Sequence, residues 1–111
     1  MSRYNDNYLH HILDSILRIE RFTEDVDQNE FNDSELIQSA VIRQIEIIGE
    51  ATKHISKELK NEYTYVPWND IAGMRDKLIH GYLGVDIEIV WDTLKKDIPQ
   101  LKRWIEEILE E

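Results

Sequence analysis

Apolar residues recur three or four positions apart along most of this chain, which is the spacing of side chains that share one face of an α-helix. The pattern predicts helices over residues 7–27, 34–59 and 67–81 and from residue 86 onward, and no segment is typical of a strand. Pro99 removes a backbone donor inside the last helix, so we expect a kink there or a break into a short fifth helix. The chain is therefore predicted to be all-α, an antiparallel four- to five-helix bundle with short loops.

Polar residues indicate where two of these helices begin, and a glycine indicates a contact between helices. Asp33 or Ser34 can cap the second helix and Asp86 the last one, because their side-chain oxygens accept hydrogen bonds from first-turn amides. Gly49 lies inside the second helix, although glycine there costs about 1 kcal/mol relative to alanine. The close approach of another helix is the usual reason for such a glycine.

Length and composition restrict the class of protein. With 111 residues, the chain is expected to form a single domain, residues 1–111, that buries roughly two-thirds of its unfolded surface. The absence of cysteine excludes disulfides and thiolate metal sites and favours an intracellular protein. The first residues lack the apolar core of a signal peptide, and no apolar run approaches the roughly 20 residues of a membrane span. We therefore expect a soluble, cytoplasmic protein with no membrane contact.

The chain is acidic, but its charge is unevenly distributed. The formal net charge of −10 at pH 7 argues against tight nucleic-acid binding, which depends on neutralising phosphates. Residues 41–82, however, carry six acidic and six basic side chains and are the least acidic part of the chain. A local cleft in this part can still attract a phosphate group. The acidic remainder is interpreted as a solvated surface or as a face for a basic partner.

The stretch from Arg75 to Tyr82 gathers three side chains that suit phosphate chemistry. Arg75 is followed by four residues, then His80, one further residue and Tyr82. Arginine stays charged and can hold two phosphate oxygens, and histidine titrates near neutral pH as an acid or a base. On a straight helix Arg75 and Tyr82 would be offset by about 20°, but His80 would lie about 140° from Arg75. We therefore expect the helix to end near Gly81, or a second copy of the stretch to complete the site.

Three neighbouring side chains add to this candidate site. Asp76 lies four positions before His80, so its carboxylate can reach the imidazole across one helical turn, orient it and favour its protonated form. Lys77 can attract a nucleic-acid backbone, and Tyr82 can stack on a base or donate to a phosphate. Each also has a plainer interpretation. Asp76 and Lys77 can be solvated helix charges, and Tyr82 can be a half-buried aromatic of the bundle.

Glu46, Glu50 and His54 share a second polar stripe, at four-residue steps on the second predicted helix. Carboxylate-bridged metal bundles use Glu-x-x-His from paired helices instead, so a metal site is the less favoured interpretation. A polar stripe that faces a partner or flanks the catalytic cleft is favoured. His10 and His11 are adjacent and would point about 100° apart, so both are interpreted as half-exposed helix residues.

The spacing of arginine, four residues, histidine, one residue and tyrosine is that of the HEPN superfamily of small helical ribonucleases, and this chain resembles its HepT branch. An Arg-x4-His spacing by itself would be weak evidence for this family, because it often arises by chance. Here the resemblance extends, in the right order, over essentially the whole chain. The segments that carry it besides the motif are residues 43–51, 66–74, 85–86, 90–91 and 97–101.

The resemblance implies a HEPN-like domain that acts as a metal-independent endoribonuclease without a cofactor, with Arg75 and His80 as catalytic residues. RNA supplies its own nucleophile, the 2′-hydroxyl, but one histidine cannot be both acid and base in one concerted step. A twofold dimer with a shared cleft would supply the missing group, and HEPN ribonucleases are similarly regarded as dimers with a composite site. Trp68 and Met74, as extra exposed apolar positions, favour the same homodimer.

The resemblance also implies regulation by a partner. HepT proteins are toxins of toxin–antitoxin pairs, and their antitoxin is an MntA-type nucleotidyltransferase. The family's motif tyrosine is regarded as the target of that partner, which implies that adenylylation (AMPylation) of Tyr82 inactivates the nuclease. The sequence does not name the RNA substrate, and tRNA follows from the resemblance alone.

Two other functions stay open. The chain can be a non-catalytic helical subunit that presents a substrate, or itself, to the nucleotidyltransferase, and the acidic surface favours this function. The combination of Arg75, His80 and Tyr82 favours the enzyme. A helical bundle with no chemistry of its own is the third alternative.

Overall fold

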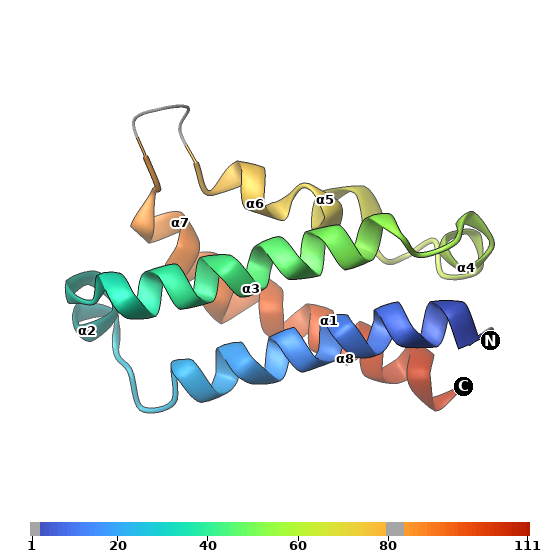
Figure 1. The fold of residues 1–111 in the computed structure, drawn as a ribbon, viewed down its shortest axis with the longest axis horizontal. Coiled ribbons are helices and arrows are strands. Elements are labelled where there is room, and N and C mark those ends of the chain that lie inside the picture. The colour runs from blue at the N-terminus through green and yellow to red at the C-terminus, as the bar shows by residue number, and fades with distance from the viewer. Residues whose placement is uncertain (1–2, 80–83) are drawn as a thin grey trace.

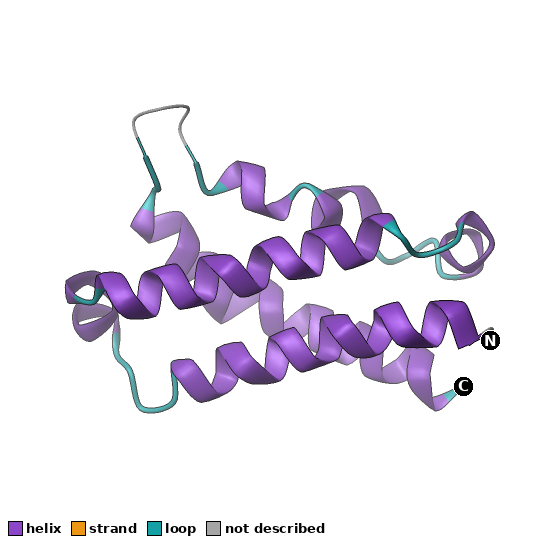
Figure 2. Cartoon of the chain, in the orientation of Figure 1, coloured by secondary structure: helices purple, strands orange, loops and turns teal. Residues whose placement is uncertain are grey.

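Two long antiparallel helices form the frame of the computed structural model, which describes residues 3–79 and 84–111. α1 (Arg3–Phe22) and α3 (Glu35–Lys53) lie side by side, and α8 (Ile98–Glu110) packs against α1 (Figure 1). Shorter helical segments complete the bundle: α2 (Gln28–Asp33), α4 (Lys57–Glu62), α5 (Trp68–Ala72), α6 (Met74–Lys77), α7 (Ile87–Asp92) and the π-helical turn η2 (Thr93–Asp97). No strand occurs in either described range (Figure 2). The expected all-α helical bundle is therefore confirmed.

The first helix ends earlier than the sequence pattern predicted. It stops at Phe22 instead of residue 27, and Asp25 adopts a φ of 59°, in the left-handed region that a helix cannot continue through. Asp27 then begins α2 with a reciprocal capping box. Its carboxylate accepts from the Glu30 amide at 2.8 Å, and its own amide donates to the Glu30 side chain at 3.3 Å. The local hydrogen bonds of this polar stretch thus build a short helix where a loop was expected.

The second predicted helix begins where expected but is divided in two. Ser34 caps α3 by accepting from the Ile37 amide at 3.1 Å, which confirms one of the two predicted caps. α3 ends at Lys53 instead of continuing to residue 59, because Ser56 leaves the helical conformation and caps α4. Asn5, on α1, stabilises this break through two hydrogen bonds. Its amide group donates to Ser56 Oγ at 2.9 Å and accepts from the Ser56 amide at 3.0 Å.

The third predicted helix, residues 67–81, is also divided. Gly73 separates α5 from α6, and α6 ends at Lys77, with Leu78 as its C-cap. The chain then runs into an isolated antiparallel bridge between Ile79 and Val85. The expectation that one helix reaches Gly81 is therefore wrong.

The last predicted helix begins as expected and changes its winding before Pro99. Asp86 caps α7 by accepting from the Ile89 amide at 3.2 Å, which confirms the predicted cap. The Ile98 amide donates to the Thr93 carbonyl, five residues back, so the turn before Pro99 is a π turn. Pro99 itself lies in the first turn of α8, where its missing donor costs little. The helix is thus disturbed near the predicted place, but by a wide turn and not by a break.

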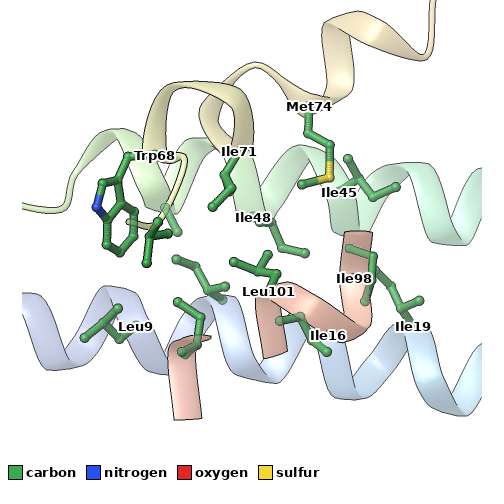
Figure 3. Close-up of a cluster of buried hydrophobic side chains, with 14 of the residues drawn as sticks. Leu9, Ile16, Ile19, Ile45, Ile48, Trp68, Ile71, Met74, Ile98 and Leu101 are labelled. Atoms are coloured by element: carbon green, nitrogen blue, oxygen red, sulfur yellow. The ribbon is translucent and has the colours of Figure 1, made fainter. Parts of the chain in front are cut away.

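The core lies between α1, α3, α8 and the α5–α6 segment, and is filled mainly by aliphatic side chains (Figure 3). Trp68 and Met74 belong to this core, each only 7% exposed, and the Trp68 indole donates to the Tyr63 carbonyl at 3.0 Å. The expectation that Trp68 and Met74 form an exposed dimer face is therefore wrong. Their apolar surface is used to dock α5 and α6 on the bundle. Within the described residues, no helix has both the length and the apolar composition that a membrane crossing requires.

Gly49 has the role that its position predicted. A Cβ atom at Gly49 would lie 3.0 Å from the carbonyl oxygen of Ala72, at the end of α5. That separation is shorter than an ordinary carbon–oxygen contact, so only glycine lets α5 approach α3 this closely. The approach places α6, and with it Arg75, against the middle of α3.

Candidate active site

Arg75 is displayed on the surface by a short helix whose neighbouring residues are buried. Ile71 and Met74 point into the core from α5 and α6 (Figure 3). Arg75 follows Met74 directly, and the change of about 100° per residue turns it outward. Its side chain is 47% exposed. A rigid attachment and an exposed guanidinium are the two properties that a phosphate-binding arginine needs.

The Arg75 groove, as we call it below, is the polar hollow between α3 and the α5–α6 segment. It has a volume of about 330 Å³. Its floor is formed where Gly49 meets Ala72, and its walls carry three cationic and three carboxylate side chains. The described residues that line it are Arg43, Glu46, Gly49, Glu50, Lys53, Ala72, Arg75 and Asp76.

Two carboxylates lie near Arg75 but do not occupy its hydrogen-bond donors. Arg75 Nε is 3.8 Å from Glu46 Oε2, and an Arg75 terminal nitrogen is 3.7 Å from Asp76 Oδ1. Both separations exceed a hydrogen-bond length, and all three side chains are at least one-third exposed. Exposed pairs of this kind contribute about 0–1 kcal/mol. The guanidinium therefore has donors free to hold a phosphate group that enters the groove.

The structure separates two of the predicted site residues that are adjacent in sequence. Asp76 lines the Arg75 groove, whereas Lys77 turns to the other side of α6 and lies 3.9 Å from Asp70. Lys77 and Met74 line a second, more apolar hollow of about 310 Å³, which α5 and α6 form with α7, η2 and α8. Lys77 is therefore not part of the groove that contains Arg75.

His80 and Tyr82 lie outside the described residues, so the structure says nothing of their positions. The predicted pairing of Asp76 with His80 assumed that both lie on one helix. α6 ends at Lys77, so the helix that contains Asp76 does not continue through the described residues that follow it, and the pairing itself stays a prediction. The carboxylate of Asp76 is instead close to Arg75, at 3.7 Å.

The polar stripe of Glu46, Glu50 and His54 divides among three partners. Glu46 lies near Arg75, Glu50 accepts from Lys53 Nζ at 3.1 Å, and the His54 ring stacks on Tyr8. In the described part of the chain, no three His, Asp or Glu side chains are placed to hold one metal ion. Glu46 and Glu50 line the Arg75 groove, in agreement with the predicted position of the stripe beside the cleft.

Arg43 and Lys53 line the groove but were not among the predicted site residues. Arg43 precedes Glu46 by three positions and Lys53 follows Glu50 by three, so helical spacing alone places them beside the polar stripe. Their involvement depends on which face of α3 receives α5 and α6. The contact between Gly49 and Ala72 fixes that face. The sequence pattern predicts a close contact at Gly49 but does not specify which segment makes it.

Sequence comparisons relate this fold and groove to known proteins. A family model described as Ribonuclease HepT-like matches residues 12–108. The chain belongs to the HepT-like ribonuclease family. The match includes α3, α5 and α6, so it covers every residue of the Arg75 groove. The family predicted from the Arg75–Tyr82 spacing and its flanking segments is confirmed.

Individual relatives of this HepT-like chain are similar over most of its length. It is 50% identical over 104 residues, 94% of its length, to a Methanocaldococcus jannaschii protein named "Gamma-glutamylcyclotransferase and putative RNase", but it spans only 47% of that protein. It is 45% identical over 104 residues to a "Putative RNase" of the same organism, covering 94% of this chain and 90% of the relative. It is 44% identical over 108 residues to the "Probable ribonuclease HepT" of Thermococcus cleftensis, covering 97% and 98% of the two chains. No solved structure gives a significant match.

Proposed function

We propose that the chain is a metal-independent endoribonuclease that cleaves RNA by attack of the 2′-hydroxyl on the neighbouring phosphate. The 2′-oxygen forms a bond to phosphorus, and the bond from phosphorus to the 5′-oxygen breaks. A base takes the proton of the 2′-hydroxyl, and an acid gives a proton to the departing 5′-oxygen. The products are a 2′,3′-cyclic phosphate and a 5′-hydroxyl. Membership in the HepT-like family supports ribonuclease activity.

The observation that carries this proposal is the placement of Arg75. Its guanidinium lies at the groove, on a helix anchored by the buried Met74 and Leu78, yet its two carboxylate neighbours are too distant and too exposed to occupy it. In the proposed reaction Arg75 holds the phosphate oxygens and stabilises the charge that develops on the phosphorane. His80, five residues further on, serves as the acid or the base.

A dimer is part of the proposal because the reaction needs both an acid and a base. One histidine cannot be both acid and base in one concerted step, so a second copy of the chain would bring the second imidazole. Trp68 and Met74 are buried and do not contribute to such a dimer. In the proposed dimer, two copies of Arg75 and His80 face one cleft across a twofold axis.

Substitution of the two catalytic residues tests the nuclease. Arg75→Ala and His80→Ala should each reduce RNA cleavage to background, while far-UV circular dichroism and the oligomeric state stay unchanged. Activity should persist in EDTA. Cleavage that survives both substitutions, or that requires a divalent metal, contradicts the proposed mechanism.

Control by a partner is the second part of the proposal. An MntA-type nucleotidyltransferase antitoxin would neutralise this toxin by adenylylating Tyr82. The Tyr82 oxygen attacks the α-phosphorus of ATP, pyrophosphate leaves, and the phenolic proton is lost. The new phosphodiester adds a negative charge seven residues from Arg75 and occupies space that the RNA needs.

Intact-mass spectrometry after co-expression with the partner should show one added adenylyl group, and Tyr82→Phe should resist neutralisation. A fully neutralised complex with unmodified Tyr82 would mean inhibition by binding alone.

A non-catalytic partner subunit is the alternative function. The formal charge of −10 favours it, because an acidic chain attracts RNA poorly and a basic partner well. The two functions differ in one observation. The alternative predicts a stable complex with the nucleotidyltransferase but no RNA cleavage by the isolated chain at any concentration.

A further inference from the structure

Four aromatic or imidazole rings gather on the side of α3 that faces α1. Tyr8, on α1, and His54, at the end of α3, are stacked with centroids 5.0 Å apart and an angle of 12° between the rings. The ring of Tyr4 meets Tyr8 edge-on at 5.1 Å, and the ring of His11 does so at 5.8 Å. His54 and His11 are exposed, and Tyr8 is half-buried. An ordered ring stack that is open to solvent is the kind of surface on which nucleic-acid bases stack.

A second hollow, adjacent to the Arg75 groove, contains this ring stack. Tyr8, His11 and His54 line a depression of about 250 Å³, together with Arg43, Ile47, Glu50 and Ala51. Arg43 and Glu50 line the Arg75 groove as well, so the two hollows meet at these residues. The joined surface crosses α3 from α6 to the first half of α1, elements that lie on either side of α3 (Figure 1).

Arg43, at the junction, forms no ion pair with a carboxylate of the described residues. Arg75 lies near Glu46 and Asp76, and Lys53 is paired with Glu50 at 3.1 Å. Between residues 3 and 79 and between 84 and 111, no carboxylate lies within ion-pair distance of Arg43. The guanidinium is exposed and retains its planar set of donors for an external anion. Glu50 is paired with Lys53 instead, so the donors of Arg43 are available to a phosphate.

The dimensions of this surface suit a short single strand. Glu46, which lies beside Arg75, precedes His54 by eight residues, a rise of about 12 Å along α3. Successive stacked nucleotides of one strand lie about 3.4 Å apart. A strand of about three to four nucleotides therefore spans the distance from the Arg75 groove to the ring stack.

We infer that Arg43, Tyr8 and His54 form a second RNA subsite, which holds single-stranded RNA beyond the phosphate at Arg75. Arg43 binds a backbone phosphate, and a base stacks on the Tyr8–His54 pair. The inference rests on the proposed ribonuclease function. It assigns the substrate class as unpaired RNA, because the ring stack can meet a base only when that base is free of its duplex partner.

Binding of uncleavable RNA tests the subsite separately from catalysis. Fluorescence anisotropy with the full chain and 2′-O-methyl oligonucleotides compares an octanucleotide, which spans both subsites, with a dinucleotide, which does not. Arg43→Gln should weaken octanucleotide binding about fivefold and lower the salt dependence of the affinity by about 0.7 in log–log slope. His54→Ala should weaken it about tenfold, since loss of one base stack costs roughly 5- to 150-fold. His54→Phe should bind almost as tightly as wild type, because a flat ring is kept.

Control variants remove a charge or a ring from other surfaces. Arg103→Gln removes a charge from α8, where Arg103 bonds to Gln100, and Tyr65→Leu removes an exposed ring beside Glu107. Both should leave octanucleotide affinity within about twofold of wild type. None of the variants should change dinucleotide affinity.

Three results would overturn the inference. The first is equal octanucleotide affinity for Arg43→Gln, His54→Ala and the controls. The second is an absence of octanucleotide binding in the wild-type chain. The third is that Arg43→Gln or His54→Ala changes the dissociation of the dimer without changing RNA affinity. This result would mean that the ring stack contacts a second copy of the chain. If Arg43→Gln and His54→Ala bind the octanucleotide as tightly as the controls while wild type still cleaves RNA, the subsite is contradicted and the nuclease is not. If the expected binding pattern is found without any cleavage, the proposed nuclease fails.

Discussion

Arg75 keeps most of its hydrogen-bonding capacity, although two carboxylates lie near it. The distances of 3.8 Å to Glu46 and 3.7 Å to Asp76 allow attraction without a fixed hydrogen bond. A carboxylate beside a phosphate site weakens anion binding, but it also holds the guanidinium over the groove. We therefore interpret Asp76 and Glu46 as groups that position Arg75 and moderate its attraction for RNA.

Removal of the Asp76 charge should strengthen RNA binding. In Asp76→Asn, Arg75 loses a competing partner, so the affinity for a single-stranded octanucleotide should rise by about 1.5- to 5-fold, as expected for an exposed pair. Asp70→Asn is the matched control, because Asp70 is equally charged and exposed but pairs with Lys77 on the opposite side of α6. Equal effects of the two substitutions on affinity would show that only the net charge of the chain matters, and would remove Asp76 from the site.

At the scale of helices, the sequence predicts where apolar faces lie better than where helices end. The caps at Ser34 and Asp86 follow from local chemistry and were predictable. The break after α3 depends on hydrogen bonds between Ser56 and Asn5, 51 residues apart in the chain, which no local pattern contains. The division of α5 from α6 at Gly73 likewise depends on how both segments pack on α3.

The candidate site shows the same limit. Arg75 and Asp76 were identified from spacing, and the groove between them and Glu46 agrees with the predicted polar stripe. Lys77 was predicted to attract the RNA backbone, and the structure places it outside this groove, beside Asp70, because residues two apart on a helix point about 200° apart. Arg43 and Lys53 were missed because their role depends on the contact between α3 and α5.

The contact at Gly49 should couple the packing of α5 to catalysis. In Gly49→Ala the new Cβ would lie 3.0 Å from the Ala72 carbonyl oxygen, so α5 and α6 must shift away from α3. The strain of overpacking, about 1–3 kcal/mol, exceeds the gain of about 1 kcal/mol in helix propensity. We expect a net loss on the order of 1 kcal/mol in the free energy of urea unfolding, together with slower RNA cleavage.

Gly73→Ala provides the control for that prediction. A Cβ at Gly73 meets only the Asn69 carbonyl oxygen at 3.5 Å, which is an ordinary contact, and the backbone there suits alanine. The substitution should therefore leave stability unchanged or raise it by about 0.4–1 kcal/mol. A Gly49→Ala protein as stable and as active as Gly73→Ala would contradict the proposed role of the close approach.

At the scale of the whole molecule, side-chain contacts join the ends of the bundle. Tyr63, at the end of α4, donates a hydrogen bond to Glu111, beyond the end of α8. On the opposite part of α8, Lys102 lies 2.9 Å from Glu20 of α1. These contacts hold α8 to elements that are distant in sequence and close the bundle around its core.

The Tyr63–Glu111 contact predicts a specific loss of stability at alkaline pH. The hydrogen bond to the Glu111 carboxylate, with burial and the nearby negative charge, raises the pKa of Tyr63 from 10.0 to about 12. Because the folded chain keeps this proton longer than the unfolded chain, the contribution is full below pH 10.0 and is lost as the pH rises through about 12. The free energy of unfolding of wild type, relative to Tyr63→Phe, should therefore fall across this window. Glu111→Gln should abolish the same difference, and an identical pH dependence in wild type and both variants would exclude the contact from a role in stability.

The proposed composite site predicts complementation between two inactive chains. Arg75→Ala and His80→Ala homodimers should both be inactive, but a mixture that forms heterodimers should regain part of the activity, because each chain lends the group that the other lacks. Native mass spectrometry can quantify the heterodimer in the same samples. Full activity in a protein that remains monomeric would contradict the shared site.

The chemical identity of the RNA ends distinguishes attack by the 2′-hydroxyl from attack by water. A defined single-stranded RNA is cleaved by the wild-type chain in the presence of EDTA, and the fragments are identified by mass spectrometry. We expect a 5′ fragment that ends in a 2′,3′-cyclic phosphate or its hydrolysis product, a 3′ fragment with a 5′-hydroxyl, and no cleavage where the attacking nucleotide is 2′-deoxy. Fragments with 3′-hydroxyl and 5′-phosphate ends, or cleavage at a 2′-deoxy position, would contradict it.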